Sequence, residues 1–119
     1  MPDKVRKFIY EMQYNFVILH HHQSNGFMEN ISPSSINSLM NLIEGASRPV
    51  IVTHMKPDGD AIGSSLAMYH FLRMSGKNDS CIVLNDRYPR YLEFLIDEGA
   101  RKAIRIHSEN ADEAIEAIR

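Results

Sequence analysis

The chain has 119 residues, of which 44% are hydrophobic and 24% are charged, and its formal net charge is −2. This length suits one ordinary domain, and the apolar fraction excludes a disordered or low-complexity chain. A near-neutral balance removes the electrostatic argument for a duplex-DNA or membrane-surface binder, and no apolar run is long enough to span a bilayer. Because Cys81 has no second cysteine to pair with, we expect a reducing, cytoplasmic location.

The first 27 residues lack helix caps and sustained hydrophobic periodicity. Their apolar stretch, 16–19, makes a poor signal peptide because three histidines follow at 20–22, where small residues would be needed. Adjacent residues point in different directions, so we expect these histidines to be solvated rather than to bind one metal ion. Residues 1–27 are therefore predicted to be a poorly packed or non-native extension, and residues 28–119 the structured part.

Regular structure is predicted from Ser32 onward. Ser32 followed by proline is an N-cap and first-turn signature, and apolar residues then recur at helical spacing until Gly45, the expected end of the helix. The β-branched run 50–53 predicts a short strand that is buried on both faces. Residues 55–59 are predicted to form a loop, because proline, aspartate and glycine follow one another there.

The rest of the chain continues to alternate helices with strands. The expected elements are a helix from Asp60 or Ala61 to about Met74, a strand over 81–84, a short helix over 91–96, a strand over 103–106, and a last helix. This last helix has Asn110 as its N-cap and Glu113 three residues later, which is a capping-box pattern. The alternation predicts an α/β fold: a doubly wound, Rossmann-like parallel sheet with helices on both faces.

The segment VIVTHMKPDGDAIGSS, residues 50–65, is the most informative for function. It places His54, Asp58 and Asp60 at the carboxyl end of a predicted strand, the edge where ligands bind in open α/β sheets. Two convergent carboxylates repel each other by roughly 4 kcal/mol at about 4 Å and an effective dielectric near 20. Splaying into water, protonation of one, or a divalent cation between them relieves the repulsion. Imidazole beside carboxylates suits manganese, iron or zinc better than calcium.

Small residues follow the two aspartates. Gly59 permits a sharp turn between them, and Gly63 and Ser64 lie near the expected start of the helix, where backbone N–H groups can approach a phosphate. Metal ligands beside such a helix start are compatible with a phosphate-ester site in which Gly63 and Ser64 contact substrate.

Each of these residues also has an ordinary structural interpretation. Asp60 fits a helix N-cap, and Asp58-Gly59 fits a common turn. His54 fits a strand-end histidine that is hydrogen-bonded to a backbone carbonyl. Spacing alone leaves metal ligation as one of several open interpretations.

The segment HMKPDGDAIGS, residues 54–64, resembles the first motif of the DHH phosphoesterase superfamily, most closely the bacterial nanoRNase (oligoribonuclease) and pAp-phosphatase branch. The resemblance implies a catalytic site in which His54 and Asp58 bind one Mn²⁺ ion and Asp60 a second, with Mg²⁺ or Co²⁺ as substitutes. It also implies short single-stranded RNA or 3′-phosphoadenosine 5′-phosphate as substrate, in-line attack of a metal-activated hydroxide on phosphorus, and a possible homodimer in the full-length form.

This sequence departs from the family pattern after the first motif. The family has a further ligand aspartate, an Asp-His-His triplet and a C-terminal substrate-binding domain, and none of these occurs here. Residues 28–119 are therefore expected to be the N-terminal part of an incomplete DHH domain, and the isolated chain to be inactive or incomplete. Two alternatives stay open: a cyclic-dinucleotide phosphodiesterase of the same superfamily, and a non-catalytic nucleotide-binding fragment.

A few other polar residues are weaker candidates. Asp86 ends the second predicted strand and faces the same sheet edge, but a turn or N-cap role is favoured over metal or substrate binding. His107, after the third strand, has a similar claim. Arg87 and Arg90 are candidates for phosphate contact, although the tyrosines beside them fit a mixed surface-and-core segment equally well. Cys81 is expected to be a small core residue.

Overall fold

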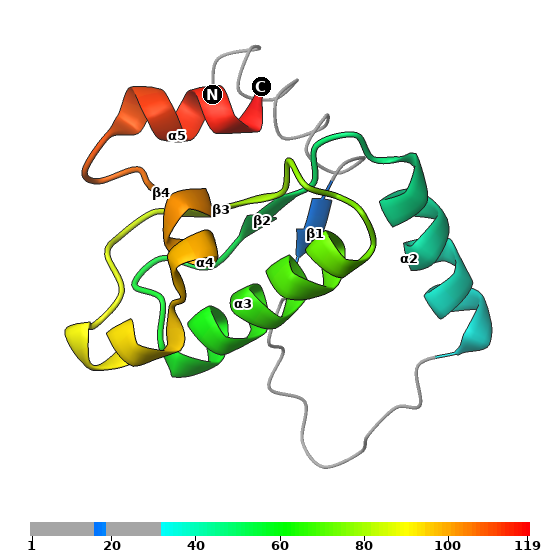
Figure 1. Ribbon diagram of the computed structural model, residues 1–119, viewed down its shortest axis with the longest axis horizontal. Helices are drawn as coiled ribbons and strands as arrows, with labels where there is room; N and C mark the ends of the chain where they lie inside the picture. Colours follow the sequence, from blue (N-terminus) through cyan, green and yellow to red (C-terminus); the bar gives the residue numbers. More distant parts are fainter. Residues whose placement is uncertain (1–15, 19–31) are drawn as a thin grey trace.

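A single parallel sheet with strand order β1-β2-β3-β4 organises the chain (Figure 1). The computed structural model describes residues 16–18 and 32–119. The strands are β1 (Phe16–Ile18), β2 (Val50–Val52), β3 (Cys81–Leu84) and β4 (Ile104–Ile106). The helices are α2 (Pro33–Gly45), α3 (Gly59–Met74), the 3-10 helix η1 (Arg90–Leu95), α4 (Glu98–Ala103) and α5 (Ala111–Ile118). The predicted α/β class is confirmed.

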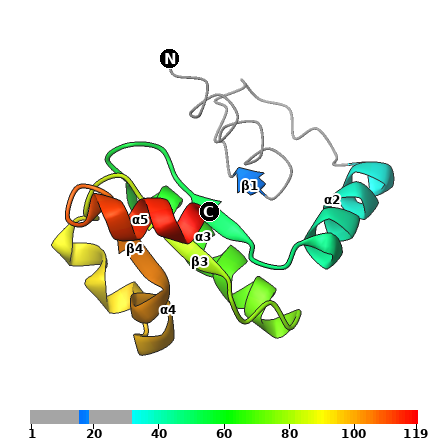
Figure 2. The same cartoon turned by 90° about the horizontal axis from the view of Figure 1, so that it is seen from above.

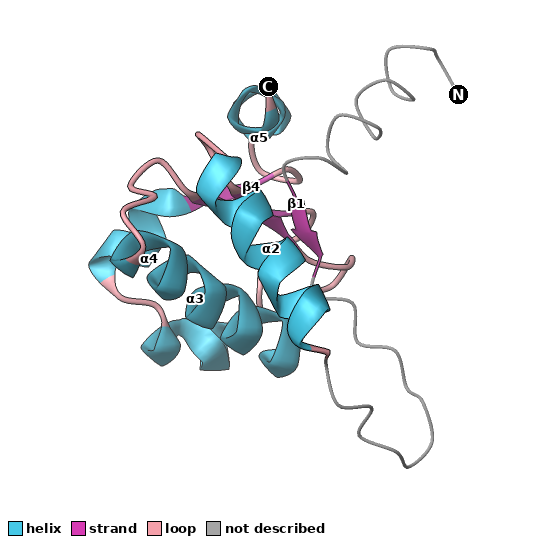
Figure 3. Ribbon diagram, turned by 90° about the vertical axis from the view of Figure 1, so that its right-hand side faces the viewer, coloured by secondary structure: helices cyan, strands magenta, loops and turns pink. Residues whose placement is uncertain are grey.

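The two faces of the sheet are covered by different helices. Ile51, Ile82 and Leu84 belong to one apolar cluster with α3, η1 and α4, whereas Val50 and Val83 pack with α5. Successive residues of a strand point to opposite faces, so this short β-branched sequence fills both cores. Figure 3, in which α5 is viewed nearly along its axis, shows the sheet between α5 and α3. Helices on both faces are thus confirmed.

Helix α3 is the central helix of the larger core. Its buried residues recur every three or four positions and are Ile62, Ser65, Leu66, Tyr69 and Leu72. Burying one such leucine or isoleucine contributes about 1.5–3 kcal/mol, and the Tyr69 hydroxyl donates a hydrogen bond to the Gly99 carbonyl at 3.2 Å. The helix ends before Gly76, whose φ of +82° lies in the left-handed region that glycine adopts without strain.

Several element boundaries differ from the predictions. Strand β1 lies inside the segment 1–27, for which no element was expected; the rest of that segment is outside the described residues. The expected helix at 91–96 is a 3-10 helix over 90–95, and α4 follows it within a stretch where none was predicted. In α5, Asn110 accepts the Glu113 N–H as expected at 3.2 Å. The return bond, however, joins the Glu113 carboxylate to the Asn110 side-chain amide.

Helix α2 lies at the opposite end of the molecule from α4, as Figure 2 shows. Ile43 is its buried residue, and apolar residues such as Ile36 and Leu42 are about half exposed. Among the described residues, no helix has the length and apolar character needed to cross a membrane.

Candidate functional site

The carboxyl ends of β2, β3 and β4 lie side by side because the three strands are parallel and in register, with Val52 opposite Val83 and Leu84 opposite Ile106. The loop after β4 is tied to the loop after β3, since the His107 N–H donates to the Leu84 carbonyl at 2.8 Å and the Ser108 N–H to the Asn85 carbonyl at 2.9 Å. At the sheet edge where the sequence predicts the site, the loops that follow β3 and β4 are thus joined by hydrogen bonds.

The His54 side chain is oriented by the backbone of the next residue. Its Nδ1–H donates to the Met55 carbonyl at 2.7 Å, and because a carbonyl only accepts, the neutral imidazole has its free lone pair on Nε2. Nε2 lies 3.8 Å from Asp58 Oδ1, and both side chains are more than half exposed. Two ligands bound at about 2.1 Å to one ion lie about 3.0–3.5 Å apart. A small side-chain rotation would therefore let His54 and Asp58 share a cation.

Asp58, rather than Asp60, is the N-cap of α3. Its Oδ1 accepts the Ala61 N–H at 2.9 Å, so the helix begins at Gly59 instead of at the predicted Asp60 or Ala61. This hydrogen bond is the main cause that lowers the pKa of Asp58, and a positive charge on His54, present only when its imidazole is protonated, acts in the same direction. The ordinary interpretations of Asp60 as the cap and of Asp58 as a simple turn residue are therefore wrong. Asp58 is a capping carboxylate held ionised next to an imidazole.

Asp60 lies in the first turn of α3 and is exposed. Across residues 32–119, no three His, Cys, Asp or Glu side chains gather closely enough to hold a metal ion. Asp60 therefore does not complete a cluster with His54 and Asp58. The donor types and their first pair fit a divalent cation, and the assignment of two ions to these three residues stays a prediction.

Asp86 reaches from the end of β3 to the loop after β2. Its Oδ2 accepts the backbone N–H of Lys56 at 3.1 Å and the side-chain amide of Asn85 at 3.2 Å. The Lys56 bond is the largest cause that lowers the pKa of Asp86. Lys56 has φ 51°, a left-handed conformation that costs a residue with a side chain about 1–2 kcal/mol. Asp86 thus holds the strained residue between His54 and Asp58, a role that the sequence did not indicate.

Gly63 and Ser64 lie in the second turn of α3, not at its start. The Ser64 hydroxyl donates to the Asp60 carbonyl at 2.6 Å, and a Cβ on Gly63 would meet no atom within 4 Å. Both residues are near the start of the helix, as expected, although they do not open it, and their contact with substrate stays a prediction. The free backbone N–H groups at the start of the helix belong to Gly59 and Asp60, because the Ala61 N–H is taken by Asp58.

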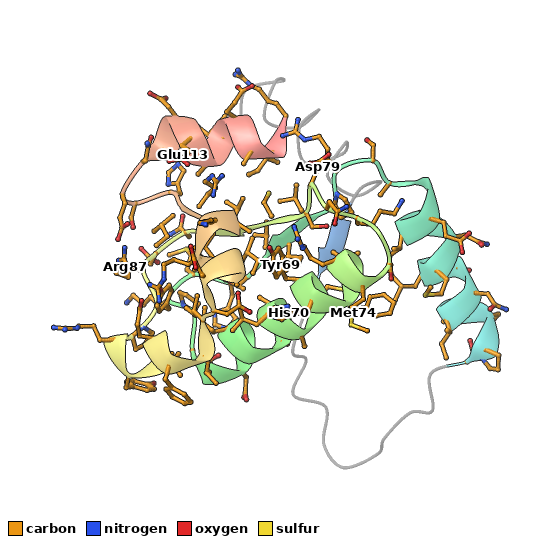
Figure 4. All side chains as sticks on the ribbon, in the orientation of Figure 1. Tyr69, His70, Met74, Asp79, Arg87 and Glu113 are labelled. Atoms are coloured by element: carbon orange, nitrogen blue, oxygen red, sulfur yellow. The ribbon has the colours of Figure 1, made fainter. Side chains whose placement is uncertain are left out.

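Arg87 and Glu109 reinforce the link between the loops after β3 and β4. They form a two-point ion pair, in which Arg87 Nη2 donates to Glu109 Oε2 at 2.9 Å and Nε to Oε1. Figure 4 shows Arg87 near η1, the side of the molecule where the motif loop enters α3. Arg87 is thus committed to Glu109, whereas the predicted phosphate contact would need it free. Periodicity cannot detect this pair, because its partners are 22 residues apart.

A hollow of about 860 Å³ opens at the opposite, amino-terminal edge of the sheet. Its lining includes Tyr69, Asp79 and Glu113, which are labelled in Figure 4, and none of the predicted site residues. Arg105, also in the lining, is paired with Glu113 at 2.8 Å. The hollow and the motif loop are therefore separate features.

Over 48 residues the chain is 48% identical to the bifunctional oligoribonuclease and PAP phosphatase NrnA of Thermus thermophilus. The alignment covers 40% of this chain and 14% of the length of that enzyme. No family profile matches the chain, and no solved structure matches it significantly. Over part of its length, this chain is thus similar to an enzyme whose name denotes phosphoester hydrolysis.

Proposed function

We propose that this chain carries part of the active site of a metal-dependent phosphoesterase that acts on short oligoribonucleotides, 3′-phosphoadenosine 5′-phosphate, or both. The observation that carries the proposal is the 48% identity to an oligoribonuclease and PAP phosphatase. The arrangement of His54 and Asp58 at the ligand-binding edge of a parallel sheet supports it independently.

In this proposal His54 Nε2 and the Asp58 carboxylate hold one Mn²⁺ ion, replaceable by Mg²⁺ or Co²⁺, and Asp60 contributes to a second. Such ions stabilise negative charge on the phosphoryl oxygens. The described residues gather two of these donors, so the 119-residue chain alone is expected to bind metal weakly and to turn over slowly. No specific observation favours a cyclic dinucleotide as substrate, and a homodimer and a cytoplasmic location stay predictions.

The protein's own groups have distinct tasks. The Met55 carbonyl fixes the His54 tautomer, and the Ala61 N–H keeps Asp58 ionised and oriented. The start of α3, a helix of 16 residues, presents the N–H groups of Gly59 and Asp60 to an anion. Together these features position a phosphate ester beside the imidazole and the carboxylate.

The test is Mn²⁺-dependent hydrolysis of 3′-phosphoadenosine 5′-phosphate and of an RNA pentamer by the intact protein. Asp58→Ser retains a capping oxygen but removes the carboxylate, so it separates ligation from folding. We expect Asp58→Ser and His54→Gln each to lower kcat/KM at least 100-fold. Asp79→Ser, at the opposite sheet edge, serves as the matched control. Undiminished hydrolysis by Asp58→Ser would refute the proposal.

A further inference from the structure

We propose that Tyr91 and Phe94, on η1, form a surface on which unpaired bases stack beside the candidate phosphoester site. This inference rests on the proposed function and specifies how the same site would recognise a short single-stranded oligoribonucleotide. It assigns base contact to a segment outside the motif loop.

The geometry of η1 places both rings on one side. Side chains three residues apart eclipse each other in a 3-10 helix, and Tyr91 and Phe94 have this spacing. Tyr91 is 71% exposed and Phe94 is 81% exposed, while Leu92 between them is buried. Leu92 therefore anchors the helix to the core and turns the two rings toward solvent. Both aromatic side chains are therefore largely open to solvent.

The anchor of η1 also connects it to the motif. A Cβ placed on Gly59 would lie 3.8 Å from Leu92 Cδ2, so η1 packs directly against the first residue of α3. Gly59 follows the capping Asp58 in the chain. Figure 1 shows η1 beside the end of α3 where the motif loop enters. The aromatic rings and the proposed phosphate position are thus held by one packed unit.

Free cations accompany the rings. Arg87 is paired with Glu109 and Arg101 with Glu93, whereas no carboxylate of the described residues lies within ion-pair distance of Arg90 or Lys56. Arg90 opens η1 next to Tyr91, and Lys56 is exposed in the motif loop. Cations that track phosphates, together with aromatic faces that take successive bases, are the combination used to bind single-stranded nucleic acid. Arg90 is in no ion pair among the described residues, and Lys56 lies close enough to Asp86 to feel its charge without pairing with it. An apolar protein partner would make no use of these two cations.

The test measures binding without turnover. Calorimetry in the absence of divalent metal compares an unmodified RNA pentamer with an abasic oligomer that has the same phosphates. We expect Tyr91→Ala and Phe94→Ala each to weaken pentamer binding about 5- to 150-fold. Abasic-oligomer binding is expected to be weaker and unchanged by either substitution.

Two controls separate stacking from other effects. Tyr91→Phe keeps the aromatic ring, so its affinity for the pentamer is expected to stay within about twofold of that of the parent. Phe71→Ala removes a partly exposed aromatic ring from the far half of α3 and should leave the pentamer affinity unchanged. Pentamer affinity unchanged in both alanine variants, or equal affinity of the parent for the abasic oligomer, would overturn the inference. The inference would also be overturned if either alanine variant sedimented as a smaller species than the parent, because the rings would then pack against a second copy of the chain.

The inference and the proposed function fail in different ways. If pentamer binding does not depend on Tyr91 and Phe94 but Mn²⁺-dependent hydrolysis is observed, only the proposed stacking surface is overturned. Aromatic-dependent pentamer binding without any Mn²⁺-dependent hydrolysis supports the stacking surface and refutes the proposed phosphoesterase.

Discussion

Replacing Asp86 with alanine removes the acceptor that holds the Lys56 N–H. That hydrogen bond, at 3.1 Å, is a tie between loops that are 30 residues apart. Lys56 has φ 51° and lies midway between His54 and Asp58 in the motif loop. Without the tie, the strain at Lys56 loses the hydrogen bond that opposes it, and the loop is expected to populate other conformations.

The strain sets the size of the effect. A left-handed conformation costs about 1–2 kcal/mol for a residue with a side chain. If the hydrogen bond from Lys56 to Asp86 supplies all of the compensation, its loss lowers the population of the metal-binding loop conformation to about 16% for a strain of about 1 kcal/mol and to about 3% for about 2 kcal/mol. The apparent Kd for a ligand of the loop rises by the inverse of that fraction, about 6- to 30-fold. We therefore expect Asp86→Ala to weaken Mn²⁺ binding by this factor.

The assay is Mn²⁺ titration followed by calorimetry, with hydrogen exchange of the Lys56 amide as a readout that needs no metal. Asp86→Asn retains an oxygen acceptor and is expected to cost less than Asp86→Ala. Lys56→Gly removes the strain, because glycine adopts positive φ freely. In the Lys56→Gly background, the cost of Asp86→Ala should therefore fall to within about threefold. Equal penalties in both backgrounds, or unchanged exchange of the Lys56 amide in Asp86→Ala, would refute the reasoning.

Three further predictions concern other parts of the molecule. The Ala61 N–H lowers the folded pKa of Asp58, so the stability that ionised Asp58 contributes is present above the ordinary pKa of 3.8 and is lost as the pH falls through the lower folded pKa. In urea unfolding between pH 2 and pH 6, the stability of Asp58→Asn should therefore fall less steeply at low pH than that of the parent. An identical pH dependence of the two proteins would contradict this. Leu92→Ala should lower the free energy of unfolding by about 2–5 kcal/mol, and Leu95→Ala, at a half-exposed position, should lower it by less than about 1 kcal/mol. Denaturant titration measures both changes, and equal losses of stability would contradict the anchoring of η1 by Leu92. Burial raises the pKa of the Cys81 thiol, so iodoacetamide should alkylate it more slowly at pH 7.5 than it alkylates free cysteine, and a faster reaction would show that the thiol is not shielded.

Local patterns in the sequence were sufficient for most of the fold. The β-branched runs predicted β2 and β3, and the cap residues Ser32 and Asn110 marked the starts of α2 and α5. These signals act within about four residues, so they can be recognised without knowledge of the tertiary structure. The start of α3 was misjudged because Asp58 and Asp60 are equally good caps by propensity, and only the structure shows that Asp58 accepts the Ala61 N–H.

The candidate site divides in the same way. The motif by itself determined that His54 and Asp58 lie at the carboxyl end of a parallel strand, and hence that an imidazole and a carboxylate come together there. Only the tertiary structure decided that Asp86 holds Lys56, that Glu109 engages Arg87, and that η1 presents its rings beside α3. Those contacts join residues far apart in the chain, and they exist because the parallel register of β2, β3 and β4 brings three loops to one edge. Spacing within one segment carries no information about that register.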